Sequence, residues 1–243
     1  NPRHTGALAK PSLPDRGSKL AQYPDSQQGA QDVEPAIVSA PPAILDGHIY
    51  TSLSGGGEGN RLVALPFGEK RQFGSPAWVY EVASAIGVSP AADSERVYFV
   101  EGAEGDKNRH LHCLDRQSGE LIWKRPVSPG ASGALGLLEE RLYVAEGPDV
   151  MACLTTGGEE LWRRAIGATR WAPDERGPLA LVATTDPAGL AALDRDTGRE
   201  LWRAELDEPP ATGPVVYKRT VLLGVGEGVQ ARSLMDGKVV WSQ

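Results

Sequence analysis

Residues 190–202 read Leu190-Ala191-Ala192-Leu193-Asp194-Arg195-Asp196-Thr197-Gly198-Arg199-Glu200-Leu201-Trp202. This is an apolar strand, a tight turn rich in Asp, Thr and Gly, and a second strand that carries a tryptophan. A glycine followed four residues later by a tryptophan occurs five times, with 39 to 45 residues between successive tryptophans. The five copies are Gly74–Trp78, Gly119–Trp123, Gly158–Trp162, Gly198–Trp202 and Gly237–Trp241. A self-similar period of this size indicates a repeat architecture.

Further short apolar segments precede each hairpin, for example Arg96–Val100 and Arg141–Val144. Turn signals come before most of them, at Asp46-Gly47, Asp93-Ser94, Glu139-Glu140, Asp174-Glu175 and Lys218-Arg219. About four short strands in about forty residues is the content of one β-propeller blade. A helical fold is excluded, because Gly and Pro interrupt nearly every stretch of fifteen residues and no apolar stripe of helical period is sustained.

The prediction is therefore an all-β chain, a β-propeller with five recognisable four-stranded blades. The blades are expected at about 36–82, 83–126, 127–166, 167–206 and 207–243. Residues 1–35 differ, since five prolines, four glutamines and one aromatic residue can bury little surface. We expect them to form an extended arm. Two arrangements stay open: five blades of a larger propeller with about six to eight blades, and a closed ring of five.

Each motif tryptophan is expected to be largely buried between its own blade and the next. The motif glycines are expected in tight turns, several of them at positive φ. These ten glycines and tryptophans are thus interpreted as structural repeat residues. Trp171 lies outside the repeat beside Arg170, and this pair is a candidate interaction site near the centre of the propeller. The alternative is that Trp171 fills space between blades.

Composition narrows the function. A net charge of −7 over 243 residues argues against nucleic acid as the main partner. No apolar stretch approaches 18 residues, so no transmembrane helix is expected in this chain. Cys113 and Cys153 occupy equivalent places in neighbouring repeats and are interpreted as small buried apolar residues, with a disulfide as the alternative.

The one candidate for a metal site is the pair His110 and His112. Side chains two residues apart in a strand lie on the same face, so the two imidazoles would lie side by side. A zinc site needs three or four ligands, and Cys113 would point to the opposite face. We therefore interpret the pair as part of a polar strand that faces solvent. No metal ligand and no catalytic residue is assigned, since neither of the remaining histidines, His4 and His48, has a nucleophile context.

Residues 192–202 resemble the blade signature of the PQQ-like repeat family, close to Ala-x-Asp-x-x-Thr-Gly-x-x-x-Trp. The opening Asn1-Pro2-Arg3-His4-Thr5-Gly6 is also similar to the start of many such propellers. The resemblance covers roughly residues 36–243 and this hexapeptide. Quinone-dependent members carry a calcium ion, an adjacent cysteine pair and a catalytic Asp. This chain has no adjacent cysteines, and Asp115 and Asp194 occupy turn positions of the motif, so no cofactor is expected.

The resemblance implies a non-catalytic propeller scaffold for protein–protein interaction, with other protein subunits as partners. The implied setting is the bacterial cell envelope, in the periplasm, as an accessory or assembly subunit associated with a membrane complex. Two alternatives remain: a fragment of a quinone-dependent dehydrogenase, and a ligand-sensing propeller domain of a larger receptor.

Overall fold

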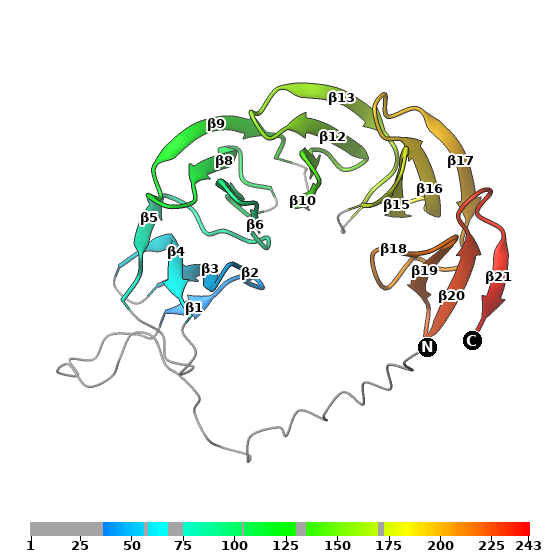
Figure 1. Ribbon diagram of the computed structural model, residues 1–243, viewed down its shortest axis with the longest axis horizontal. Helices are drawn as coiled ribbons and strands as arrows, with labels where there is room; N and C mark the ends of the chain where they lie inside the picture. Colours follow the sequence, from blue (N-terminus) through cyan, green and yellow to red (C-terminus); the bar gives the residue numbers. More distant parts are fainter. Residues whose placement is uncertain (1–35, 56–57, 68–74, 104, 130–134, 170–172) are drawn as a thin grey trace, which may run out of the picture.

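The computed structural model describes residues 36–55, 58–67, 75–103, 105–129, 135–169 and 173–243. These residues form 21 strands in five antiparallel sheets and contain no helix. The sheets follow one another along the chain and around an arc, each with one edge toward a common centre and the other on the rim (Figure 1). The fold is thus an all-β array of PQQ-like propeller blades, numbered here 1 to 5 in chain order. The arm predicted for residues 1–35 lies outside the described residues.

Blades 1 and 2 occupy the blue-to-green part of the arc (Figure 1). In blade 1 the innermost position is shared by two short strands that both pair with the second strand. The strands of blade 1 are β1 (Ile37–Val38), β2 (Ala43–Leu45), β3 (His48–Ser54), β4 (Asn60–Pro66) and β5 (Trp78–Val82). Those of blade 2 are β6 (Ala91–Ala92), β7 (Arg96–Glu101), β8 (Arg109–Asp115) and β9 (Leu121–Val127).

Blades 3, 4 and 5 each contain four strands in chain order from the centre to the rim. Blade 3 has β10 (Leu135–Leu138), β11 (Arg141–Ala145), β12 (Val150–Thr155) and β13 (Glu160–Ala165). Blade 4 has β14 (Asp174–Arg176), β15 (Leu179–Thr185), β16 (Ala188–Asp194) and β17 (Glu200–Glu205). Blade 5 has β18 (Val215–Tyr217), β19 (Thr220–Val225), β20 (Gly228–Ser233) and β21 (Val239–Ser242).

The sequence pattern of a strand follows its place in the blade. The second and third strands are covered on both faces by neighbouring blades, so they read as almost continuous apolar runs such as Val97–Val100 in β7. The outer strands have partial cover and alternate, as in β9, where Lys124 and Pro126 are exposed and Val127 is buried. In blades 2 to 5 the third strand also has a register shift against the outer strand, directly after the residue that pairs with the motif tryptophan.

The tight turn between the first two strands differs from prediction in one blade. Asp174 and Glu175 lie within β14, and the turn falls at Gly177-Pro178. Glycine at φ +59° supplies the left-handed conformation that this turn requires. In blades 1, 3 and 5 the corresponding turns are at the predicted positions, where Asp46, Glu139 and Lys218 adopt positive φ. Acidic pairs alone therefore do not locate this turn.

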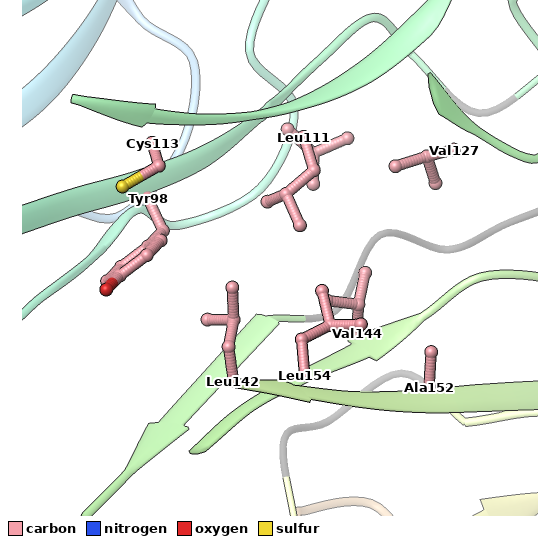
Figure 2. Close-up of a cluster of buried hydrophobic side chains, with 9 residues drawn as sticks. Tyr98, Leu111, Cys113, Val127, Leu142, Val144, Ala152 and Leu154 are labelled. Atoms are coloured by element: carbon pink, nitrogen blue, oxygen red, sulfur yellow. The ribbon is translucent and has the colours of Figure 1, made fainter. Parts of the chain in front are cut away.

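The hydrophobic core is divided into separate layers between adjacent blades. Figure 2 shows the layer between blades 2 and 3, where Tyr98 and Leu111 face Leu142 and Leu154 across the gap between the two sheets. All four of these side chains are fully buried. Each blade is thus stabilised mainly by its neighbours, as expected for a repeat protein whose units cannot bury an apolar face alone.

Candidate functional site

Each described motif glycine lies against the tryptophan of the preceding blade. A Cβ on Gly119 would lie 2.6 Å from Cδ2 of Trp78, and one on Gly198 would lie 2.5 Å from Cδ2 of Trp162. The same relation joins Gly158 to Trp123 and Gly237 to Trp202. All four glycines have positive φ, as predicted. The repeated spacing therefore encodes a contact between blades, in which the glycine of one repeat receives the indole of the repeat before it.

The indole N–H adds a directional contact to this packing. Nε1 of Trp78 donates to the carbonyl oxygen of Arg116 at 2.9 Å, and Nε1 of Trp162 donates to Arg195 at 2.9 Å. Trp123 makes the equivalent bond to Thr156 at 3.2 Å. The acceptors lie in the turn that contains the next motif glycine, so the turn receives both the ring face and the ring N–H.

The fifth tryptophan behaves differently. Trp78 and Trp162 are only 8% and 4% exposed, whereas Trp241 on β21 is 46% exposed. The expectation that all five motif tryptophans are largely buried is wrong for Trp241, whose face is not packed against a further blade among the described residues. Gly74, Arg170 and Trp171 lie outside the described residues, so the first motif glycine and the candidate interaction pair stay predictions.

A tyrosine on the second strand supports the tryptophan in the first three blades. Ring centroids are 5.9 to 6.0 Å apart in the pairs Tyr50–Trp78, Tyr98–Trp123 and Tyr143–Trp162. Tilted and edge-on pairs at this distance are favourable beyond the area that they bury. The Gly–Trp spacing does not predict this pair, although the tyrosine recurs in the sequence as the third residue of the second strand. In blade 4 the equivalent residue is Leu181.

The acids of the motif turns are used within the turns. Oδ1 of Asp194 accepts hydrogen bonds from the hydroxyl and the backbone N–H of Thr197, and these bonds lower the pKa of Asp194. Asp115 accepts the same two bonds from Ser118, with the same direction of pKa shift. Each ionised acid thus fixes a tight turn, as the motif predicts.

His112 departs from the prediction of a polar strand facing solvent. It is 1% exposed, stacks on Phe99 at 4.7 Å, and its Nε2 lies 2.8 Å from Oε2 of Glu101. Burial lowers the pKa of His112 to about 4, so the ring is neutral near pH 7. The prediction failed because both faces of β8 are covered by neighbouring blades. Across the described residues no group of three potential metal-ligating side chains occurs.

Glu101 is the centre of a polar network between blades 1 and 2. Burial alone would raise its pKa, but hydrogen bonds from His112, from Lys124 at 3.2 Å and from the backbone N–H groups of Ser84 and Ala83 lower it. The carboxylate therefore stays ionised, with partners in blade 2 and in the segment that connects blade 1 to blade 2. Such a buried charge is stable only while these partners remain in place.

Glu146 holds the equivalent position between blades 2 and 3. It is 4% exposed, and its two carboxylate oxygens lie 3.2 Å from Nη2 of Arg125 and 2.5 Å from Nη1 of Arg163. Arg125 belongs to the outer strand of blade 2, so the ion pair crosses the interface. The sequence contains a signal for both acids. In both repeats a glutamate follows five residues after an arginine, as Glu101 follows Arg96 and Glu146 follows Arg141.

The residues do not fit the quinone site of the dehydrogenases in the resembled family. Cys113 and Cys153 are free, buried thiols in two different core layers, and burial raises the pKa of each to about 12. The interpretation as small buried apolar residues is confirmed. Asp115 and Asp194 are committed to their turns, as described above. No step of quinone chemistry is therefore assigned to these side chains.

The rim of the propeller carries aliphatic side chains on its outer strands. The residue before the motif tryptophan is apolar and 42% to 59% exposed in four successive blades. These residues, named the rim aliphatics here, are Ile122, Leu161, Leu201 and Val240. Single exposed apolar residues are ordinary, but a repeated position along one rim can supply contacts for a protein partner.

These features define the class of the molecule, a PQQ-like repeat β-propeller. The model of one family, described as outer membrane protein assembly factor BamB, matches residues 107–243. The chain belongs to this family.

Curated relatives carry the same description as this family. Outer membrane protein assembly factor BamB of Alkalilimnicola ehrlichii is 33% identical over 142 residues, which cover 51% of this chain and 35% of the relative. The Yersinia pestis protein of the same name is 24% identical over 218 residues, covering 84% of this chain and 53% of the relative. The chain thus spans between about a third and a half of the length of these relatives.

The structure of BamB from Moraxella catarrhalis superposes with a TM-score of 0.56 at 17% identity, covering 85% of this chain and 74% of the other. A europium-containing methanol dehydrogenase superposes with a TM-score of 0.65 at 12% identity, covering 87% of this chain and 53% of the other. At these identities the likeness shows the fold alone. In the described part of the chain, no helix has the length and hydropathy needed to cross a membrane.

Proposed function

We propose that this chain is a non-catalytic scaffold in the bacterial cell envelope, an accessory subunit for the assembly of outer membrane proteins. The observation that carries the proposal is the family match over residues 107–243, together with two relatives named as outer membrane protein assembly factors. The location that follows is the periplasm, and the partners are protein subunits of a membrane complex.

The roles of the ionisable side chains support a scaffold. His112 contacts Tyr80 of blade 1, and Glu146 pairs with Arg125 of blade 2. Glu101 accepts the backbone N–H groups of the segment that follows β5, and Asp115 and Asp194 fix turns. These groups stabilise a rigid array and leave recognition to the loops and the rim. The rim aliphatics are the contact surface that we assign to the partner, because they are exposed and repeat from blade to blade.

Deletion of the gene in the source bacterium tests this function. The expected result is a reduced amount of protein in the outer membrane fraction, restored by the wild-type gene. Complementation with Ile122→Glu or Leu161→Glu should restore less, because a charge on the rim disfavours an apolar contact. Met235→Glu is the matched control, since Met235 is 81% exposed and lies in a turn of blade 5.

Unchanged outer membrane proteins in the deletion strain would contradict the proposal. The dehydrogenase alternative has its own test, in which the purified chain is mixed with quinone and calcium and assayed for dye reduction with alcohol substrates. Activity there would overturn the non-catalytic assignment.

A further inference from the structure

A cavity of about 580 Å³ opens between the outer strand of blade 3 and the motif turn of blade 4. Its apolar lining includes Ile166 and Leu193, and its charged lining consists of Arg164, Arg199, Asp194 and Glu200. The stem of Arg164 passes over Gly198, where a Cβ would lie 3.0 Å from its Cγ. The glycine that receives Trp162 thus also lets the Arg164 side chain lie across the turn.

At the equivalent interface between blades 2 and 3, glutamates neutralise the charge of the arginines. There Arg125, two residues after the motif tryptophan, lies 3.2 Å from Glu146 and 3.6 Å from Glu160. Arg163 lies 2.8 Å from Glu160 as well as 2.5 Å from Glu146. The residue after the motif glycine, Glu159, adds a third acid. This interface therefore carries a net negative charge.

Between blades 3 and 4 two of these acids are replaced. Thr184 occupies the position of Glu146, and Arg199 occupies the position of Glu159. The remaining acid, Glu200, is held by Arg203, with Oε2 2.7 Å from Nη2. Arg203 is further fixed by a bond to the Ile166 carbonyl at 2.8 Å. With Asp194 of the motif turn included, the three arginines Arg164, Arg199 and Arg203 outnumber the two acids by one, so the interface carries a net charge of +1.

The guanidinium groups of Arg164 and Arg199 have no ion pair like the one between Glu200 and Arg203 among the described residues. Among the described residues no carboxylate lies within ion-pair distance of Arg164, whose Nη1 donates to the Arg163 carbonyl at 2.8 Å. Arg199 is near enough to Asp194 to act on its carboxylate electrostatically, but Oδ1 of that acid already accepts the N–H groups of its own turn. Guanidinium groups in this situation are suited to bind an external oxyanion.

We propose that this cavity binds a carboxylate side chain of a protein partner, such as a glutamate in an exposed segment, between Arg164 and Arg199. The apolar lining from Ile166 and Leu193 favours a residue with aliphatic neighbours over a bare anion. The net charge of −7 disfavours close approach to an anionic lipid surface, whereas one acidic side chain can enter the cavity. The choice of a protein partner rests on the proposed function.

A peptide titration followed by NMR on arginine-labelled protein tests the site. The probe is acetyl-Leu-Glu-Leu-amide, and its glutamine counterpart is the reference. The glutamate peptide should shift the Nε–Hε signals of Arg164 and Arg199 and bind about fivefold more tightly than the reference or better, since charge-assisted bonds are the stronger kind. Arg199→Gln and Arg164→Gln should each remove most of that preference. Arg219→Gln, in the exposed turn of blade 5, should leave it unchanged.

Thr184→Glu provides an independent check, because it installs the acid found at the equivalent position of blade 3. It should supply an internal counter-ion and abolish the preference for the glutamate peptide. If it does not fold, the two arginine variants still decide. Equal binding of both peptides, or tighter binding of inorganic phosphate than of the glutamate peptide, would overturn the proposal. That outcome would leave the deletion phenotype untouched, so the cavity and the proposed function fail separately.

Discussion

At the scale of single residues, substitution of two glycines distinguishes the cost of backbone strain from the cost of losing a contact between blades. Gly198 has φ +67° and lies against Trp162, whereas Gly177 has φ +59° and open space where a Cβ would be. Gly177→Ala should lower the free energy of unfolding by about 1–2 kcal/mol, the cost of a left-handed alanine. Gly198→Ala should cost about 3–5 kcal/mol, because the new Cβ also displaces a buried indole. Urea unfolding of both variants measures the difference, and equal losses would contradict the docking role.

His112 gives a pH dependence whose sign follows from its environment. Its pKa is about 4 in the folded chain and near 6.5 when unfolded, so the unfolded state binds more protons between these values. The contribution of His112 to stability is therefore complete above about pH 6.5 and lost as the pH falls toward 4, by up to about 3 kcal/mol. In His112→Gln this part of the pH slope should disappear. His110→Gln, on the same strand, should retain it.

At the scale of strands and blades, the outer strand joins one blade to the next through its tryptophan. Trp162→Ala should lower the free energy of unfolding by about 3–5 kcal/mol, since it removes a buried ring, its contact with Tyr143 and its bond to Arg195. Trp241→Ala should cost less than about 1 kcal/mol, because this ring is 46% exposed. Denaturant unfolding followed by circular dichroism measures both. Similar losses of unfolding free energy in the two variants would contradict this, because they would show that packing against the next blade contributes nothing.

The blade pattern could be predicted because its signals are local. The turn acids, the motif glycines and the apolar runs all lie within about forty residues, so spacing alone indicates hairpins and a repeat. The environment of His112 could not be read in this way, since it depends on Tyr80 and Phe99 and on the cover of both sheet faces. The cavity was missed for a related reason. Its charge follows from comparing Thr184 with Glu146, which requires the blades to be aligned in space.

At the scale of the whole molecule, stability is distributed unevenly along the arc. The first three blades carry the tyrosine–tryptophan pair. Buried Glu101 accepts hydrogen bonds from the segment that follows the outer strand of blade 1, and buried Glu146 pairs with Arg125 of blade 2. Between blades 4 and 5 the tyrosine position holds Leu181, and the buried Nε1 of Trp202 has no hydrogen-bond partner among the described residues. All four residues of β21 are exposed. The contacts that hold blade 5 are thus fewer in kind and weaker than those that hold blade 3.

This gradient predicts the order in which the blades open. In a repeat array each unit is stabilised by its nearest neighbours, so a unit covered on one side opens at a lower free energy. For the 243-residue chain, backbone amides of β20 and β21 should exchange with deuterium about ten to a hundred times faster than those of β11 and β12. Hydrogen-exchange mass spectrometry measures this, with the peptides of blade 3 as the reference within the same sample. Exchange of blades 3 and 5 in a single cooperative step would contradict it, because the array would then unfold as one unit despite its unequal interfaces.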